Sequence, residues 1–170
     1  MINTVKIKEN GYLINDEMYV PNDSSNRHYQ EVQEWLKTNT PEPEFSIEEL
    51  KLQKISEINS SCSKQIVSGF TSTALDTATP TTYHYQSEQI DQLNLIGLVS
   101  GGVDDVLKCS KDDSSGNPTT WNYELHTIAQ LTQVLNDGKA YKINLLTKAA
   151  DLKAQVEAVA TQAELDAIVW

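Results

Sequence analysis

The sequence predicts an α+β protein: a small N-terminal β-meander plus helix, then a helix-rich domain with a short antiparallel sheet and a long C-terminal helical region. Three observations predict this class. Short β-prone runs separated by turn residues occur at residues 5–20 and 103–125. Apolar residues recur at helical spacing before the second group and again from Thr127 to Val159. A strand leads directly into a helix at residues 83–99, which we take as the centre of the larger domain.

The composition is that of a globular chain with an acidic surface. Its 170 residues include 13 lysines and arginines against 24 aspartates and glutamates, so the net charge is −11. The basic residues are scattered, and we exclude nucleic-acid binding because no cationic stripe could displace counterions from phosphate. No apolar run approaches the ~20 residues that cross a bilayer. Residues 1–8 lack the features of a signal peptide, so we expect an intracellular protein without membrane insertion.

Residues 1–40 are expected to form an N-terminal module. Asn10-Gly11 separates the runs at 5–8 and 12–14, and this pair favours a type I′ turn, in which both central residues need φ > 0. A second turn at residues 15–17 returns the chain through residues 18–20. A helix is then predicted from about 24 to 38, with an apolar stripe formed by Tyr29, Val32, Trp35 and Leu36.

Two prolines mark the boundary between the predicted domains. Pro41 and Pro43 remove backbone donors and favour extended chain, so we take residues 41–45 as a linker and residues 46–170 as the second domain. Ser46 and Glu49 fit a capping box, in which two side chains satisfy free N–H groups at a helix start. The predicted helix runs to about Ser68, with Gly69 as its C-terminal cap and an apolar face of Ile55, Ile58, Cys62 and Ile66.

The central stretch follows a predicted loop or extended segment at residues 71–82. Aromatic and polar residues alternate through Tyr83, His84 and Tyr85, as in a half-buried strand. From Ser87, a candidate N-cap, apolar residues recur at 90, 93, 96 and 99, which is the spacing of one helix face. Gly101-Gly102 is predicted to end this helix.

Two β-prone runs, 103–110 and 119–125, predict an antiparallel hairpin with residues 83–85 as a third strand. The helical pattern from Thr127 to Val159 is interrupted at Asp137-Gly138, so either two helices meet at Gly138 or one long helix bends there. Thr161 and Glu164 fit a second capping box, which opens a short last helix. We expect Ile168 and Trp170 to dock into the core or into a neighbouring chain.

The sequence contains no motif for catalysis, a cofactor or a metal. The three histidines lie in separate segments, and neither Cys62 nor Cys109 belongs to a Cys-x-x-Cys, so we expect no metal site and two separate thiols. The loop at 111–117 has the oxygen ligands and glycine of a calcium loop but lacks its last glutamate, and we interpret it as a solvated hairpin tip. Tyr83, Tyr85, Trp121 and Tyr123 could line a sugar-binding groove, but cross-strand packing is favoured. We therefore expect a protein that is not an enzyme.

Two pieces of the chain resemble phage tail proteins. Residues 20–36, with Val20-Pro21, Asn26-Arg27-His28-Tyr29 and Trp35, followed by Asn39-Thr40-Pro41, resemble a stretch of short tail-fibre and tail proteins of bacteriophages and prophages. Residues 47–170 resemble an uncharacterised domain common in phage tail-fibre-related proteins. The matching pieces there are residues 54–58, Ser68-Gly69-Phe70, Tyr83-His84-Tyr85, residues 91–95, Trp121 and residues 163–168.

The resemblance implies a structural component of a virion tail, attached to the fibre or the baseplate and synthesised in the host cytoplasm. A tail-fibre assembly chaperone and a receptor-binding module are the alternatives. Other phage tail or fibre proteins are the implied partners, together with a homo-oligomer in which a trimer is favoured because phage fibres are usually three-fold. We expect contacts to draw on Trp35, Tyr83, Tyr85, Trp121, Tyr141, Leu145, Leu152 and Trp170.

Overall fold

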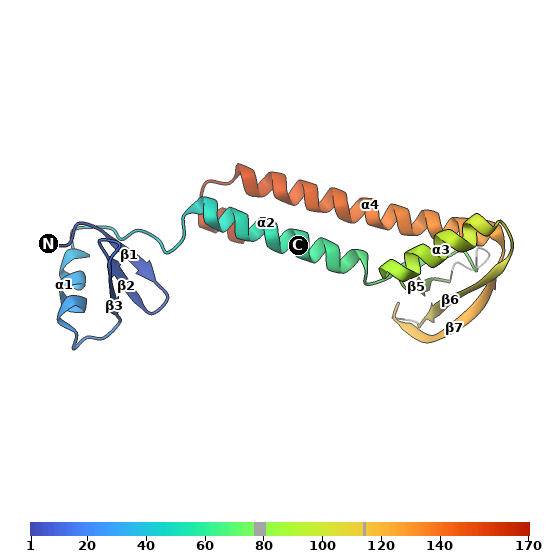
Figure 1. Cartoon of the computed structure of the whole chain (residues 1–170), viewed down its shortest axis with the longest axis horizontal. Helices are drawn as coiled ribbons and strands as arrows, with labels where there is room; N and C mark the ends of the chain where they lie inside the picture. Colours follow the sequence, from blue (N-terminus) through green and yellow to red (C-terminus); the bar gives the residue numbers. More distant parts are fainter. Residues whose placement is uncertain (77–80, 114) are drawn as a thin grey trace. The chain divides into compact units, whose positions relative to one another are not determined.

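The computed structural model describes residues 1–76, 81–113 and 115–170. The chain divides into two compact units, Met1–Leu52 and Gln53–Trp170, and helix α2 (Ile47–Ile66) runs across the division. Each unit contains its own antiparallel sheet together with helices (Figure 1). The fold is α+β, as predicted.

The first unit is a three-stranded meander with one helix packed on it. Strands β1 (Val5–Lys8), β2 (Gly11–Ile14) and β3 (Met18–Pro21) are consecutive antiparallel neighbours. Helix α1 (Arg27–Trp35) begins after the N-cap Asn26. The core consists of Val5, Ile14, Val20 and Val32, with Tyr29, Trp35 and Leu36 among the side chains packed against it. The predicted apolar stripe of α1 is confirmed.

The type I′ turn predicted at Asn10-Gly11 is wrong. Within the meander, the residues with positive φ are Asn15 and Asp16, at 53° and 59°, and Glu17 N–H donates to the Ile14 carbonyl at 3.0 Å across this second turn. Gly11 is a strand residue, and a Cβ there would lie 2.2 Å from the Val20 carbonyl oxygen. The glycine is needed because the neighbouring strand approaches closely.

The proline segment predicted as a linker is held against β1. Glu42 and Lys6 form a parallel bridge, in which Ile7 N–H donates to the Glu42 carbonyl and Glu42 N–H donates to the Val5 carbonyl, each at 2.8 Å. Lys8 and Glu44 also lie 3.8 Å apart. Residues 41–45 therefore cover part of the edge of β1.

The second unit contains a four-stranded antiparallel sheet in the order β4 (Phe70–Ser72), β5 (Tyr83–Tyr85), β6 (Asp105–Asp112) and β7 (Pro118–His126). The predicted hairpin and its third strand are confirmed. Strand β4 was not predicted; it pairs with β5 from Phe70 opposite Tyr85 to Ser72 opposite Tyr83. Residues 77–80 of the predicted 71–82 loop lie outside the described residues, as does Ser114 of the predicted hairpin tip.

Helix α3 (Gln89–Gly101) follows β5 and ends at Gly102, whose φ is 69°. Three of the four residues of its predicted apolar face are wrong, because Ile90, Leu93 and Ile96 are 60%, 57% and 47% exposed, whereas Val99 packs against the core. The helix packs instead through buried Leu95, with Leu98 and Val99 beside it. Its N-cap is Glu88, whose N–H donates to the Asp91 carboxylate at 3.0 Å, and not Ser87.

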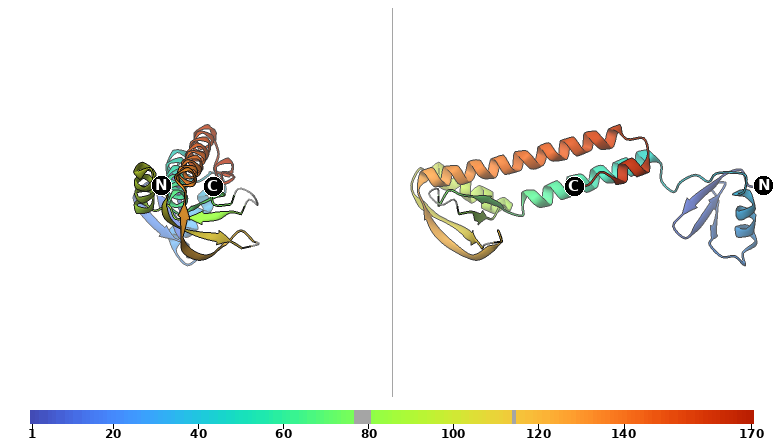
Figure 2. Two further views of the ribbon diagram at one scale, coloured as in Figure 1. Left: turned by 90° about the vertical axis from the view of Figure 1, so that its right-hand side faces the viewer. Right: turned by 180° about the vertical axis from the view of Figure 1, so that it is seen from behind.

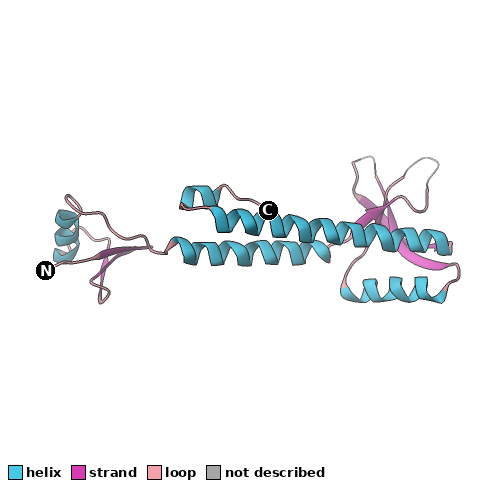
Figure 3. Cartoon of the chain, turned by 90° about the horizontal axis from the view of Figure 1, so that it is seen from above, coloured by secondary structure: helices cyan, strands magenta, loops and turns pink. Residues whose placement is uncertain are grey.

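Helix α4 (Ile128–Ala158) lies alongside the part of α2 from Gln53 onward, and α5 (Gln162–Asp166) folds back beside them (Figures 1, 2 and 3). The Cys62 thiol of α2 donates to the Leu145 carbonyl of α4 at 3.6 Å. The capping boxes at Ser46 and at Thr161 are confirmed. Buried side chains from these helices and the C-terminal residues are Ile58, Cys62, Leu131, Val134, Leu145, Ala149, Val156, Leu165 and Ile168.

Helix α4 continues through Asp137-Gly138 as one long helix, so the alternative in which two helices meet there is wrong. The helix starts at a capping box formed by Thr127 and Gln130 and is drawn as one continuous ribbon (Figure 1). Gly138 faces the ring of Phe70 in β4. The glycine therefore serves packing against the sheet and not helix termination.

Candidate functional site

Of the eight residues predicted for an interface, two are buried and six are half-buried. Tyr85 and Leu145 are buried, and Tyr83 and Tyr141 pack against the core of the second unit. Trp35 packs against the core of the first unit, and Leu152 is half-buried. Trp121 and Trp170 are also half-buried, with lysine ammoniums 5.9 Å (Lys108) and 4.6 Å (Lys148) from their ring centroids. Their role at an interface stays a prediction.

A buried group of ionisable side chains connects β5, β6 and β7: Tyr85, Cys109 and His126. His126 Nδ1 lies 2.8 Å from the Glu124 carbonyl, which can only accept, so Nδ1 carries the proton and Nε2 accepts from the Tyr85 hydroxyl at 3.0 Å. Burial lowers the pKa of His126 and raises the pKa of Cys109 to about 11. At neutral pH the imidazole is uncharged and the thiol stays protonated, so this group provides hydrogen-bonded packing and no thiolate nucleophile.

The carboxylates at the β6–β7 turn contact groups of the turn itself and of the neighbouring strand β5. Asp113 accepts from the N–H groups of Asn117 and Ser115 at 2.9 and 2.8 Å, and these bonds lower the pKa of Asp113. His84 Nε2 lies 2.8 Å from the Asp112 carboxylate.

Among the described residues, no three His, Cys, Asp or Glu side chains lie together so that they could hold a metal ion. Nor is any helix in the described ranges both long and apolar enough to cross a bilayer.

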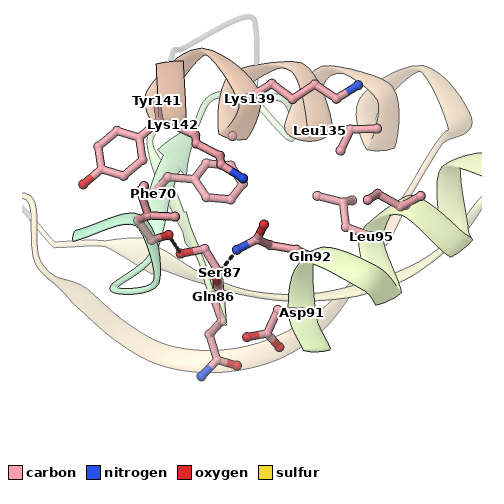
Figure 4. A pocket seen from close by; sticks show the side chains of 13 residues that line it. Phe70, Gln86, Ser87, Asp91, Gln92, Leu95, Leu135, Lys139, Tyr141 and Lys142 are labelled. Carbon is pink, nitrogen blue, oxygen red and sulfur yellow. Dashed lines mark hydrogen bonds between the residues drawn. The ribbon is translucent and has the colours of Figure 1, made fainter. Parts of the chain in front are cut away.

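The structure forms a cavity of about 210 Å³ between α3 and α4, which we call the α3–α4 cavity (Figure 4). Its lining is mostly apolar. Polar atoms enter mainly at its ends, from the start of α3 and from the lysines of α4. The cavity is lined by Ile66, Phe70, Gln86, Ser87, Asp91, Gln92, Leu95, Ile96, Leu135, Gly138, Lys139, Tyr141 and Lys142.

Ser87 fixes the wall of this cavity at the start of α3. Its buried hydroxyl donates to the Ile66 carbonyl at 2.7 Å and accepts from Gly69 N–H at 2.8 Å, so it ties the end of α2 to the β5–α3 connection. Gln92 Nε2 donates to the Ser87 carbonyl at 2.8 Å (Figure 4). The wall is therefore held by hydrogen bonds that do not involve a ligand.

The charges around the α3–α4 cavity differ between its two sides. Lys139 and Lys142 project from α4, both exposed, whereas Asp91 points away from them on the opposite wall (Figure 4). The Asp91 carboxylate accepts from Glu88 N–H. Neither lysine forms an ion pair with any residue that the structure describes.

A second hollow, the α3–β6 groove, lies on the other side of α3 and has a volume of about 600 Å³. Strand β5 pairs with β6 only at residues 109–111, so among the described strands none pairs with residues 105–108 on this side. Val106 and Tyr123 are 47% and 71% exposed in the groove. The groove is lined by Tyr85, Gln86, Asp91, Leu93, Asn94, Leu95, Gly97, Leu98, Val106, Leu107, Lys108 and Tyr123.

Sequence reasoning missed both hollows because it assigned the wrong residues of α3 to the core. One signal was present in the sequence. Apolar residues occur on every side of this helix, at 90, 93, 95, 96, 98 and 99, which is more than a single packed face can bury. A helix that is apolar on every side is either completely buried or leaves apolar side chains exposed. In this structure, apolar side chains of α3 are exposed.

One comparison with known proteins found a match. A family model described as a domain of unknown function (DUF4376) matches residues 49–169. No curated protein and no solved structure matches the chain. The matched range includes every residue that lines the α3–α4 cavity and the α3–β6 groove.

Proposed function

The chain belongs to the DUF4376 family, and we propose that it is a structural component of a bacteriophage tail, attached to the fibre or the baseplate, which acts through protein–protein contacts. The phage assignment is supported by the resemblance of residues 20–36 and 47–170 to tail-associated proteins. The observation that carries the mode of action is the exposed apolar surface of the α3–β6 groove. Virions are then the expected location of the protein.

Three neighbouring elements contribute apolar side chains to this surface. Leu93 of α3, Val106 of β6 and Tyr123 of β7 all line the groove and are more than two-fifths exposed. Leu125 stands opposite Val106 in the strand register and is 66% exposed. Exposed apolar side chains gathered on neighbouring elements mark interaction sites, and tyrosine is among the residues that dominate binding energy.

The buried ionisable group supports a non-enzymatic role. The Cys109 thiol, with its pKa raised to about 11 by burial, is not poised as a nucleophile. The Tyr85 hydroxyl, which burial also protects from ionisation by raising its pKa, donates to a neutral imidazole. These side chains are accounted for by packing and hydrogen bonding within the sheet.

Mass spectrometry of purified virions tests the proposal. We expect peptides of this chain at a stoichiometry comparable with other tail proteins. The matched variants Leu93→Glu and Ser100→Glu each add a carboxylate to an exposed position of α3, but only Leu93 lines the groove. We expect Leu93→Glu to reduce incorporation and Ser100→Glu to leave it unchanged.

Two results would contradict the proposal. Absence of the chain from virions would remove the structural role, and if its co-expression then raised the yield of soluble fibre, the assembly chaperone would take its place. Equal incorporation of the two variants would remove the groove as the contact surface. Light scattering of the purified chain measures its oligomeric state, for which we propose a trimer.

A further inference from the structure

We propose that the α3–α4 cavity is an anchor site for one apolar side chain of an acidic segment in a partner protein, with Lys139 and Lys142 binding carboxylates beside that side chain. This inference assumes one part of the proposed function, namely that the chain acts through protein–protein contacts. It does not depend on the identity of the tail protein involved.

The size of the cavity selects a side chain over a small-molecule ligand. Its volume is about 210 Å³, whereas pockets for drug-sized ligands occupy roughly 300–1,000 Å³. Its apolar lining includes the ring of Phe70 and the side chains of Leu95 and Leu135 (Figure 4). A single leucine, methionine or phenylalanine side chain that fills such a hollow is the usual form of an interface hot spot.

The charge of the partner follows from the unpaired lysines. Some lysine ammoniums of this acidic chain lie within 4.0 Å of a carboxylate, as at Lys6, Lys8 and Lys54, and others do not. Lys139 and Lys142 have no such neighbour among the described residues, and the Lys142 ammonium reaches over the opening of the cavity (Figure 4). A segment with carboxylates beside the anchor complements this rim, and a basic segment is repelled.

Asp91 does not cancel this positive charge. Its side chain lies on the α3 wall and points away from the two lysines (Figure 4). Its carboxylate accepts from Glu88 N–H at the helix start, at 3.0 Å, which holds it on that wall. The side of the cavity formed by α4 is therefore open to carboxylates of a partner.

Short blocked peptides test the anchor and the charge separately. The probes are Gly-Asp-X-Asp-Gly peptides with leucine, phenylalanine or alanine at X, and the same peptides with lysine in place of aspartate. Each is titrated into the isotope-labelled full chain, and amide shifts are followed by NMR. We expect the leucine or phenylalanine acidic peptide to shift the amides of Leu95, Gly138 and Tyr141, with binding at least about tenfold tighter than that of the alanine or basic peptides.

Matched charge reversals provide the control. Lys142→Glu and Lys111→Glu change the net charge equally, and both lysines are exposed, but only Lys142 lines the cavity. We expect Lys142→Glu to weaken acidic-peptide binding by at least about fivefold, and Lys111→Glu to leave it within about twofold, since its charge is remote from the cavity and screened.

Four results would overturn the inference. They are equal binding of leucine and alanine peptides, equal binding of acidic and basic peptides, equal effects of the two reversals, and no shift at the cavity with any peptide. If Lys142→Glu instead changes the oligomeric state of the chain alone, the occupant is a second copy and the partner assignment is wrong. Peptide binding by a chain that is absent from virions would refute the virion role and leave this inference standing.

Discussion

The ring of Phe70 lies against Gly138 so closely that a Cβ on Gly138 would stand 2.8 Å from Phe70 Cζ. Phe70 is itself buried, and its ring stacks on Tyr85 with centroids 5.7 Å apart. At the residue before Gly138, the Asp137 carboxylate accepts a hydrogen bond from the Ser72 hydroxyl at 2.5 Å. Strand β4 is thus joined to α4 at a position where a larger residue does not fit.

We predict that Gly138→Ala destabilises the second unit despite the better helix propensity of alanine. Alanine gains about 1 kcal/mol in a helix interior, whereas overpacking a buried contact costs about 1–3 kcal/mol. The expected net loss in the free energy of unfolding is about 1 kcal/mol, measured by urea denaturation. In the Phe70→Leu background, where the ring is absent, the same substitution should be neutral or stabilising.

Gly97 is the matched control for this prediction. It also lies inside a helix, α3, but a Cβ there would meet nothing within 4 Å. Gly97→Ala should therefore stabilise by up to about 1 kcal/mol. If Gly138→Ala stabilises as much as Gly97→Ala, the Phe70 contact does not restrict this position.

We predict that Ser87→Ala is much more harmful than loss of a helix cap. The substitution leaves Gly69 N–H and the Ile66 carbonyl without their partner, both at a position where Ser87 is buried. The free energy of unfolding should fall by about 2–3 kcal/mol. Ser100→Ala, on the exposed side of α3, should change it by less than about 0.5 kcal/mol. Similar values for the two variants would contradict this role of Ser87.

We predict that His126 makes stability depend on pH below neutrality. Its pKa is lowered by burial, so the folded state binds fewer protons than the unfolded state, in which the pKa is about 6.5. Its contribution is complete above about pH 6.5 and is lost as the pH falls toward the lower folded pKa, with a slope of at most about 1.4 kcal/mol per pH unit. Urea denaturation as a function of pH measures this.

His126→Gln provides the test of that assignment. It should lower stability at neutral pH and flatten the pH dependence between about pH 6.5 and 5. The carboxylates with lowered pKa, such as Asp113 and Glu164, act in a separate window below about pH 4.5. An unchanged slope in His126→Gln would show that another group is responsible.

The elements could be predicted from the sequence because their local signals agree with the fold. Capping boxes at Ser46 and Thr161 mark helix starts, and Gly102 adopts the positive φ that ends α3. The failures involve contacts between distant segments. Asn10-Gly11 has the composition of a turn, but the approach of Val20 decides how Gly11 is used. A glycine at position 138 of a helical pattern suggests a break, but its contact with Phe70 explains why the residue is small.

The α3–α4 cavity could not be predicted for the same reason. Phe70, Leu95 and Gly138 come from a strand and two helices that are separated in the sequence. Strand β4, which places Phe70, is too short to show an alternating pattern. The apolar spacing of α3 is compatible with several packed faces, so it does not determine that Leu95 is buried and Ile96 is exposed.

We predict that the buried side chain of Ile168 holds the C-terminal residues in place. Its side chain is 7% exposed, whereas that of the next residue, Val169, is 73% exposed. Ile168→Ala should lower the free energy of unfolding by about 2–4 kcal/mol, because it removes buried methylenes and leaves a cavity. Val169→Ala should change it by less than about 0.5 kcal/mol. Urea denaturation gives both values, and limited proteolysis should show faster cleavage near α5 only in Ile168→Ala.

The same pair of variants separates docking in the chain's own core from docking in a neighbouring chain. If Ile168 acts within its own chain, the loss of stability in Ile168→Ala is the same at every protein concentration, because any oligomerisation through other surfaces affects the variant and the parent protein equally. If it acts in a neighbour, stability depends on concentration in the parent protein, and the variant loses that dependence. The burial of Ile168 within a single chain leads us to expect the first result.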